Sequence, residues 1–324
     1  MVGMVRIHKY GGPEVLTYED VDLPPPGHGE VQIRHTAIGL NFVDTYFRSG
    51  LYKGPVLPFV PGNEGAGVVV AVGDHVNDFH VGDRIAYATI TGSYCEARNI
   101  PVGGLVHLPA SIDDRTAAAM MLKGMTAQYL VRKTYEVKPG DTVLIQAAAG
   151  GVGLLLSQWC HALGAKVIGT AGSKDKAELA YANGCDEVIL YREEDFVHRV
   201  KEITKGKGCD VVYDGVGQDT YPGSLDCLKP RGLWVSFGNA SGAIKDFNLL
   251  LLSQKGSLYA TRPTLNTHIA TKEDLYATAN DLFEAVLKGA LKIPIHQTYA
   301  LRDVQKAHRD LEGRATTGST LLLP

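Results

Sequence analysis

The chain has 324 residues, of which 45% are hydrophobic, and its 32 Lys and Arg residues against 35 Asp and Glu give a formal net charge of −3. This length favours about two domains, and the charge argues against a nucleic acid or an anionic membrane as partner. No apolar run approaches the roughly 18 residues of a membrane span, and the N-terminus lacks the apolar core of a signal peptide. We therefore expect a soluble, cytoplasmic protein.

Cysteine and histidine spacing predicts no metal centre. The five cysteines lie far apart without a C-x-x-C pair, and the eleven histidines are equally scattered. An odd cysteine count at such spacing fits neither a disulfide framework nor a zinc knuckle. Buried, inert thiols are the expected state of most of the five, which are Cys95, Cys160, Cys185, Cys209 and Cys227.

Residues 1 to about 125 have the pattern of short strands and turns. Apolar and polar residues alternate over 31–35, Gly65–Gly73 is a buried-strand candidate, and Pro24–Gly27 is one of several turn clusters. Alternation at a period of two, interrupted by Pro and Gly, is typical of a β-rich domain.

From about residue 126 the pattern changes to alternating strands and helices, which favours a parallel sheet with helices on both faces. After the strand that begins at Thr142, further strands are predicted at 165–170, 187–190, 210–213, 232–237 and 257–261. Helices are predicted at 152–163, 193–204, 272–288 and 302–312. A closing strand at 320–323 should return to the first sheet. The predicted domains are 1–125 with 264–324, and 126–263.

The stretch Thr142–Gly153 is the most informative in the chain. An apolar, β-branched run ends in a glycine-rich turn that opens into a helical pattern, with Ala148, Gly150 and Gly153 at the three glycine positions of G-x-G-x-x-G. In such a turn the second glycine admits a pyrophosphate to the backbone and the third lets the helix pack on the strand. A helix N-terminus and its free N–H groups then bind the phosphates. This context favours a dinucleotide site over an ordinary strand–turn–helix.

The second predicted strand indicates which dinucleotide is bound. NAD-preferring folds place Asp or Glu near its tip to bind the ribose 2′-hydroxyl, whereas this chain has no carboxylate there before Asp175. Ser173, Lys174 and Lys176 would instead favour a 2′-phosphate. NADPH is therefore the predicted cofactor, although either lysine taken singly is also compatible with a solvated helix start.

Five segments together resemble a known family along the whole chain: Tyr10–Leu16, Asn41–Gly50, Pro61–Gly67, Ala147–Gly153 and Gly313–Gly318. The sequence resembles the medium-chain dehydrogenase/reductase superfamily, in its zinc-free quinone oxidoreductase or zeta-crystallin branch, and is similar to bacterial NADPH:quinone reductases. The resemblance implies an α/β fold, with a GroES-like β-rich catalytic domain and a Rossmann domain of doubly wound parallel sheet. It also implies a homodimer joined through edge strands of the nucleotide-binding sheets.

The resemblance also predicts that no zinc is bound. Alcohol dehydrogenases of the superfamily hold a catalytic zinc on two cysteines and a histidine, and the matching positions here are Asn41, Asn63 and Lys123. Zinc requires thiolate, imidazole or carboxylate donors, which two amides and an ammonium do not supply. The four-cysteine lobe of a structural zinc is absent as well. Whether Lys123 does more than form an ion pair in the cleft stays open.

Without a Lewis acid, the substrate must accept hydride readily, as a quinone or an activated enone does. Asn41, Tyr46 and Tyr52 are the candidate catalytic residues, and the nearby Phe42 and Phe47 would supply an aromatic wall for a flat acceptor. With a reference pKa near 10, tyrosine is a hydrogen-bond donor at neutral pH. For Tyr52, a place on a loop surface is an equal alternative.

The resemblance implies a set of cofactor contacts spread over the chain. Asn41, Tyr46 and Thr126 are expected to contact NADPH, with Phe237, Gly238 and Thr261 at its nicotinamide half, Gly150, Gly151, Val152 and Gly153 at the pyrophosphate, and Gly172, Ser173, Lys176 and Tyr191 around the adenosine ribose phosphate.

The predicted function is NADPH-dependent reduction of quinones by hydride transfer without zinc. One alternative is an enone or enoyl-thioester reductase of the same superfamily, in which Tyr46 donates a proton. The other is a non-enzymatic role, as a crystallin-like or RNA-binding protein. The slightly acidic chain argues against RNA, because binding to a phosphate backbone depends on clustered Lys and Arg.

Overall fold

A computed structural model describes residues 1–324, which divide into two compact units. The first unit contains Met1–Met125, Ile269–Leu287 and Ile293–Pro324, and the second contains Thr126–His268 and Lys288–Lys292. The domain limits inferred from the sequence stay a prediction, and each unit is described by itself.

The second unit is built on a six-stranded parallel sheet in the order β10-β9-β8-β11-β12-β13. Its strands are β8 (Thr142–Ile145), β9 (Lys166–Ala171), β10 (Glu187–Leu190), β11 (Cys209–Asp214), β12 (Leu228–Ser236) and β13 (Tyr259–Thr261). In order along the chain this is 3-2-1-4-5-6, the Rossmann arrangement, in which a ligand binds where the strand order reverses. The predicted Rossmann fold is confirmed.

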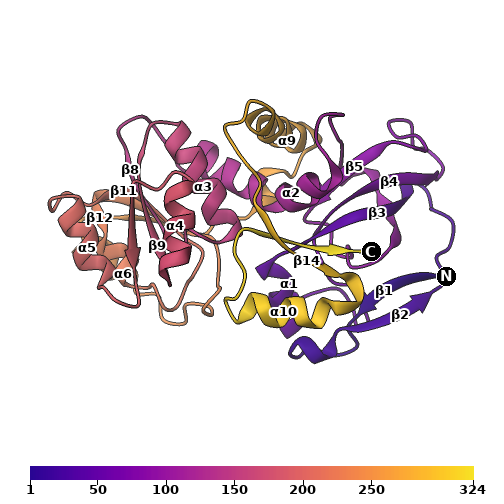
Figure 1. Cartoon of the computed structure of the whole chain (residues 1–324), viewed down its shortest axis with the longest axis horizontal. Coiled ribbons are helices and arrows are strands. Elements are labelled where there is room, and N and C mark those ends of the chain that lie inside the picture. Colours follow the sequence, from indigo (N-terminus) through magenta and orange to yellow (C-terminus); the bar gives the residue numbers. More distant parts are fainter. The chain divides into compact units, whose positions relative to one another are not determined.

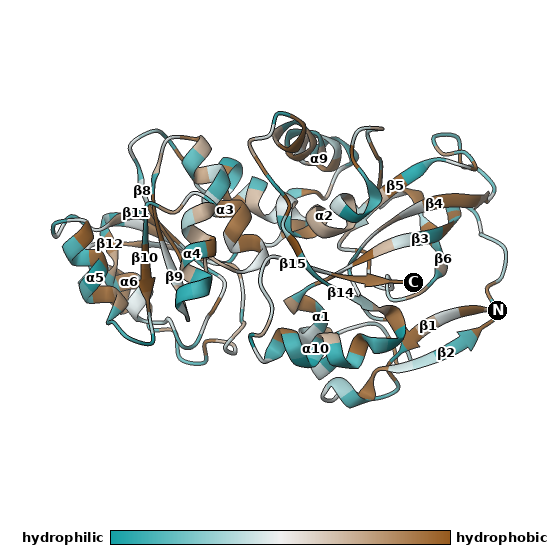
Figure 2. Cartoon of the chain, in the orientation of Figure 1, coloured by the Kyte–Doolittle hydropathy of each residue, from teal (hydrophilic) through white to brown (hydrophobic).

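Helices cover both faces of this sheet. Figure 1 shows α3 and α4 on one side of it and α5 and α6 on the other. The helices of the unit are α3 (Gly151–Ala162), α4 (Lys174–Ala182), α5 (Phe196–Ile203), α6 (Gly223–Asp226), α7 (Leu250–Gln254) and α8 (Leu265–His268). Leu144, Ile168, Val212 and Trp234 bury their side chains in the core between strands and helices. Figure 2 shows both hydrophilic and hydrophobic segments on α5, as a helix on the outside of a sheet requires.

The first unit is dominated by a seven-stranded sheet in the order β14-β15-β3-β4-β5-β7, with β6 paired to β3. Its strands are β3 (Glu30–Leu40), β4 (Glu64–Val72), β5 (Arg84–Ala88), β6 (Ala97–Pro101), β7 (Leu105–His107), β14 (Ile295–Ala300) and β15 (Ser319–Leu323), and β1 (Val2–Arg6) pairs with β2 (Thr17–Val21) beside it. Val31, Ile33, Val69 and Ile85 form part of a fully buried core. The predicted β-rich character is confirmed.

The tail of the chain completes this sheet. β15 pairs in parallel with β14 and antiparallel with β3, so the closing strand returns to the first sheet as expected. Helices α9 (Lys272–Leu287) and α10 (Val304–Glu312) agree with the two predicted helical stretches. β14 is a strand that the sequence analysis does not predict.

The structure corrects the expectation that residues 1–125 hold only strands and turns, because α1 (Phe42–Ser49) and α2 (Asp114–Tyr129) are helices. Helix α1 is short, and its start is fixed by the Asp44 carboxylate, which accepts the Asn41 N–H at 2.9 Å. Helix α2 is rich in buried Ala and Met, without the polar face that reveals a helix by its periodicity. A turn of π-helix (Leu130–Thr134) follows it.

All five cysteines are free and buried. Burial raises the pKa of Cys95 and Cys209 to about 12 and that of Cys185 to about 11, and it also raises the pKa of Cys160 and Cys227. None of the helices has both the length and the apolar character of a membrane span.

Candidate active site

The glycine-rich turn joins the end of β8 to the start of α3, with Gly150 directly before the helix. A Cβ atom on Gly153 would overlap the carbonyl oxygen of Ala147, and one on Gly150 would lie 3.2 Å from the same oxygen. Only glycine at position 153 therefore lets α3 sit this close to the turn. The first N–H groups of α3, from Gly151 and Val152, are left for a ligand.

The turn is fixed to the neighbouring strand β9. The N–H of Ala147 donates to Thr170 Oγ1 at 3.0 Å, and the N–H of Ala148 donates to the Thr170 carbonyl oxygen at 2.9 Å. Ala147 has a φ of 55°, in the left-handed region that favours glycine. A Cβ on Gly169 would lie 2.6 Å from the Cβ of Ala148. The methyl group that replaces the first glycine of the motif is thus accommodated by a glycine on the next strand.

The residues expected at the adenosine end lie around the start of α4. Ser173 is the N-cap of this helix, and its hydroxyl accepts the N–H of Lys176 at 3.4 Å. A Cβ on Gly172 would lie 2.6 Å from the hydroxyl of Tyr191, whose side chain is 38% exposed. The structure therefore brings all four predicted residues to one end of the sheet, next to a helix N-terminus that attracts anions.

Of the residues expected at the nicotinamide end, Phe237 and Gly238 follow β12 and Thr261 is the last residue of β13. Backbone contact is close here, because a Cβ on Gly238 would lie 2.8 Å from the Cα of Gly215. Arg262, which comes directly after Thr261, donates from Nη1 to the carbonyl oxygens of Ser236 at 2.7 Å and Gly238 at 3.1 Å. Arg262 is not among the residues predicted from the sequence, although its place at the carboxyl end of a predicted strand, where ligands bind in such sheets, points to the site. Thr126, the fourth residue predicted for this end, lies on α2, more than 100 positions earlier in the sequence, and is 8% exposed.

In the first unit, α1 and the loop after it gather aromatic side chains. The rings of Tyr46 and Tyr52 are 5.1 Å apart and edge-on, Phe47 is 5.9 Å from Tyr52, and Phe42 is 6.5 Å from Tyr46. The Tyr52 N–H donates to the Tyr46 carbonyl oxygen at 3.1 Å. Tyr52 thus packs against Tyr46, and the four aromatic side chains are in contact with one another; their role as a wall for an acceptor stays a prediction.

Asn41 belongs to a buried cluster with two charged residues. Its Nδ2 donates to Glu64 Oε2 at 2.7 Å, and Lys123 Nζ donates to the same oxygen at 3.0 Å. The other oxygen, Glu64 Oε1, accepts the Leu122 N–H at 2.7 Å. Asn41 and Lys123 are each 5% exposed and Glu64 is 0% exposed. The ion pair that the sequence analysis allowed for Lys123 is therefore present.

A second buried network holds the inner face of α1. Asp44 accepts hydrogen bonds from Asn63 Nδ2 at 2.8 Å and from the Tyr94 hydroxyl at 2.9 Å. Tyr94 also contacts His308 Nε2 at 3.0 Å, and Arg48 Nη1 lies 2.9 Å from His308 Nδ1. Arg48 is bound in addition to the Glu312 carboxylate at 2.7 Å. Helix α1 is thus tied to α10, which comes more than 250 residues later.

The direction of each hydrogen bond in this network follows from its ends. Arg48 only donates, so His308 Nδ1 accepts and, in a neutral ring, Nε2 carries the proton. The ring then donates to Tyr94, whose hydroxyl donates to the carboxylate of Asp44. Burial lowers the pKa of His308 to about 3, with the Arg48 charge as a second cause. Burial also raises the pKa of Asp44 to about 6, against the hydrogen bonds that it accepts.

The side chains at Asn41, Asn63 and Lys123 do not fit zinc. Both amides are hydrogen-bonded to carboxylates, and the side-chain oxygen Asn63 Oδ1 already accepts the Thr91 hydroxyl at 2.9 Å. The Lys123 ammonium would repel a divalent cation, and amides are not the donors that zinc selects. No group of three or more His, Cys, Asp or Glu side chains is placed to hold a metal ion.

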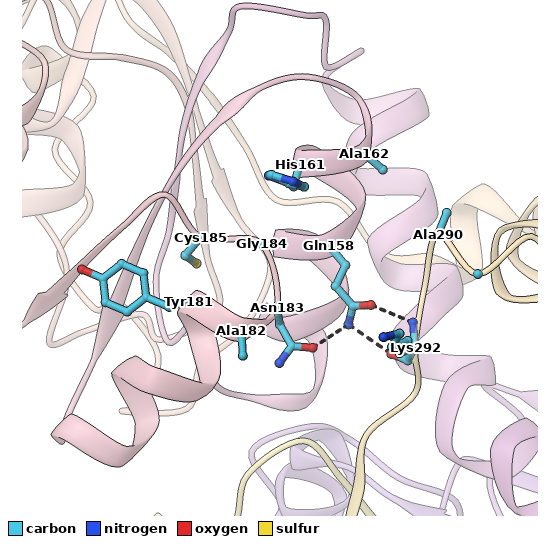
Figure 3. Close-up of a pocket in the computed structure, with 11 residues that line it drawn as sticks. Gln158, His161, Ala162, Tyr181, Ala182, Asn183, Gly184, Cys185, Ala290 and Lys292 are labelled. Atoms are coloured by element: carbon cyan, nitrogen blue, oxygen red, sulfur yellow. Dashed lines mark hydrogen bonds between the residues drawn. The ribbon is translucent and has the colours of Figure 1, made fainter.

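A pocket of about 350 Å³ lies elsewhere in the second unit (Figure 3). It is lined by residues from the C-terminal halves of α3 and α4 and from residues 289–292, whereas the glycine-rich turn lies at the other end of α3. Gln158 spans it, donating to Asn183 Oδ1 at 3.1 Å and to the Lys292 carbonyl oxygen at 3.0 Å. None of the predicted site residues lines this pocket.

Comparisons with known proteins agree with this geometry. Residues 27–141 match the family described as alcohol dehydrogenase GroES-like domain, and residues 151–284 match zinc-binding dehydrogenase. The quinone oxidoreductase of Pseudomonas aeruginosa is 54% identical, with both chains covered completely, and the 2-haloacrylate reductase of a Burkholderia species is 45% identical over 100% of this chain and 99% of its own. The crystal structure of Escherichia coli quinone oxidoreductase complexed with NADPH superimposes with a TM-score of 0.97 at 51% identity, over 99% of this chain and 100% of that one.

The fold and the glycine-rich turn define a dinucleotide-dependent dehydrogenase or reductase. The chain belongs to the quinone oxidoreductase family, within the medium-chain dehydrogenases and reductases.

Proposed function

We propose that the protein reduces quinones with NADPH by hydride transfer, without zinc. The observation that carries this function is the full-length similarity, at 51% identity, to a quinone oxidoreductase whose crystal structure holds NADPH. The glycine-rich turn supports it, because its backbone leaves the space that a pyrophosphate needs. NADPH supplies the hydride from its nicotinamide when bound.

In this proposal the second unit binds and orients the cofactor. The turn Gly150–Gly153 holds the pyrophosphate at the start of α3, where the N–H groups of Gly151 and Val152 are the donors. Ser173 and Lys176 recognise the 2′-phosphate, and Gly172 leaves room beside it while Tyr191 stacks on the adenine. Thr126, Phe237, Gly238 and Thr261 contact the nicotinamide half. Arg262 joins the proposed site because it holds two carbonyl oxygens, one at the end of β12 and one in the loop after it.

The first unit provides the surface for the acceptor. Tyr46 and Tyr52 present aromatic faces to a flat ring, and their hydroxyl groups are donors that can meet negative charge as it develops on the acceptor oxygen. Asn41, at the start of the same helix, contacts the cofactor or the acceptor through its amide. Because a quinone is already electrophilic, these neutral groups need only orient it.

Reduction of an activated enone or an enoyl thioester is the second candidate, with Tyr46 as proton donor. It is supported by the relative named as a 2-haloacrylate reductase. The two functions share the cofactor and differ in the acceptor, so a comparison of acceptors separates them.

The test measures NADPH oxidation by the purified protein with 1,4-benzoquinone and with a 2-enoyl thioester, each repeated with NADH. We expect benzoquinone to be reduced with NADPH faster than the thioester is. Turnover of the thioester alone would assign the second function. Salt-sensitive retention of RNA together with no NADPH oxidation by any acceptor would instead indicate a non-enzymatic role.

We further propose that the protein is a cytoplasmic homodimer joined through β13. This strand is the last in its sheet, and Tyr259 on it is 61% exposed. Leu249 and Leu250, in the segment before it, are 71% and 58% exposed, and an unpaired edge next to apolar side chains is suited to pairing with a second copy. Light scattering should give twice the chain mass, and Tyr259→Lys should give monomers because a charge on an edge strand opposes edge-to-edge pairing.

A further inference from the structure

The cluster of Asn41, Glu64 and Lys123 contains a fully buried carboxylate for which the proposed function has no role yet. A buried ion pair is weak evidence for stability, because the cost of removing two charges from water offsets their attraction. Glu64 nevertheless has each of its oxygens occupied, one by the Leu122 N–H and the other by Asn41 and Lys123. Such complete pairing in the interior indicates that the carboxylate holds its partners in defined positions.

The backbone around Glu64 is shaped to admit it. A Cβ on Gly39, in the adjacent strand β3, would overlap Glu64 Oε2. Glycine at this position thus leaves the space in which the carboxylate reaches Asn41. Gly39 also offers its carbonyl oxygen to Asn41 Nδ2 at 3.5 Å.

The chemistry of these neighbours decides which way the Asn41 amide points. A carboxylate and a backbone carbonyl oxygen only accept hydrogen bonds, so the amide NH₂ group must face them and the amide oxygen must face away. Lys123 Nζ, which only donates, binds the same carboxylate oxygen at 3.0 Å. A glutamine at position 64 would instead offer an acceptor and a donor, and both orientations of the Asn41 amide would then be allowed.

We propose that Glu64 is a positioning residue for the reaction: it fixes the orientation of the Asn41 side chain, with Lys123 as its counter-charge. The inference rests on the proposed function, in which Asn41 contacts cofactor or acceptor. Glu64 acts through Asn41 and touches neither ligand.

The test is a double-mutant cycle on kcat/KM for NADPH-dependent reduction of 1,4-benzoquinone, using Glu64→Gln, Asn41→Ala and the two together. Glu64→Gln alone should lower kcat/KM by about tenfold or more, whereas in the Asn41→Ala background it should lower it by less than about threefold, because residues that act as a unit are not additive. Glu96→Gln is the matched control, since Glu96 also accepts a backbone N–H, at 3.0 Å, and a hydroxyl, at 2.8 Å. It should leave kcat/KM unchanged.

Additive losses in the cycle would overturn the positioning role and leave the proposed function intact. An Asn41→Ala variant with normal kcat/KM would also overturn it, because Glu64 could not then act through Asn41. No benzoquinone reduction by the wild-type protein would instead count against the proposed function itself.

If Glu64→Gln does not fold, Glu64→Gln combined with Lys123→Met removes both buried charges and takes its place in the cycle. The melting temperature of each variant identifies the folded ones. The same coupling with Asn41→Ala is expected, and additivity would again overturn the proposal.

Discussion

The predicted site residues of the two units differ in which groups they offer to a ligand. The second unit offers mainly backbone, in a turn of a few consecutive residues held by Thr170 on the next strand. The first unit offers side chains, and their orientation depends on partners as distant as Asn41 and Glu64 or Arg48 and His308. A backbone site is encoded locally by glycine, whereas a side-chain site is encoded by long-range contacts that only the folded chain brings together.

The largest effect should come from breaking the backbone part. Gly153→Val places a branched side chain against the carbonyl oxygen of Ala147 and forces α3 away from the turn. We expect NADPH affinity to fall at least about a hundredfold, as the helix N-terminus moves out of reach of the pyrophosphate. A fluorescence titration with NADPH measures this. Gly103→Ala is the control and should bind NADPH normally, because a Cβ there would meet nothing within 4 Å. Unchanged NADPH binding by Gly153→Val would contradict the proposal that the glycine-rich turn holds the pyrophosphate.

Side-chain burial in the first unit should make stability depend on pH. His35 donates from Nδ1 to the Cys95 carbonyl oxygen at 2.7 Å and lies 2.7 Å from the Tyr87 hydroxyl through Nε2. Burial lowers the pKa of His35 to about 3, with the Arg98 charge as a second cause. Between pH values of about 3 and 6.5 the side chain at position 35 binds a proton in the unfolded chain but not in the folded one. The free energy of unfolding therefore decreases by several kcal/mol as the pH falls through this window.

The measurement is urea unfolding from pH 4.5 to 7.5 for the wild type and for His35→Gln. His308 contributes with the same sign as His35. Asp44, whose pKa burial raises to about 6, contributes with the opposite sign because it releases a proton on unfolding. Two histidines outweigh one aspartate, so wild-type stability should rise with pH and the variant should show a shallower slope. Equal slopes would show that His35 does not titrate on unfolding.

A smaller effect is expected at the adenosine end, where one side chain joins the backbone site. Lys176→Ala should weaken NADPH binding by about tenfold or more while changing NADH binding little, because a charged hydrogen bond to the 2′-phosphate contributes about 1.5–3 kcal/mol. Titration with both cofactors measures the ratio. Lys174→Ala, two positions earlier in the chain, is the variant whose NADPH and NADH affinities are compared with those of Lys176→Ala. An equal loss of affinity for both cofactors would show that Lys176 does not read the 2′-phosphate.

The smallest effect should follow from removing one link in the side-chain network. Tyr94→Phe leaves the His308 Nε2–H without a partner and removes one of the two hydrogen bonds that Asp44 Oδ2 accepts, the other coming from the Asn41 N–H. The change should cost about 1–2 kcal/mol of unfolding free energy. Tyr18→Phe is the control, since its hydroxyl bonds to the partly exposed Glu96 and water can replace it. Urea denaturation compares the two. A smaller loss for Tyr94→Phe than for Tyr18→Phe would mean that the network does not stabilise α1.

The same contrast explains what the sequence could predict. The Rossmann order, the glycine-rich turn and the family follow from contiguous patterns, and they are confirmed. The roles of the individual site residues stay predictions. Helix α2 was not predicted because nearly all of its side chains are buried, so no polar face reveals the helical period. The contacts of Glu64 were not predicted for another reason. Its partners Asn41 and Lys123 lie 23 and 59 positions away in the sequence, and no local sequence pattern indicates that they meet.

The burial of all five cysteines has a consequence for an enzyme that handles quinones. A quinone is a Michael acceptor, and the species that adds to it is the thiolate. With every sulfur enclosed and the pKa of Cys95 and Cys209 raised to about 12, almost no thiolate exists at neutral pH. The protein should therefore escape arylation by its own substrate during prolonged turnover.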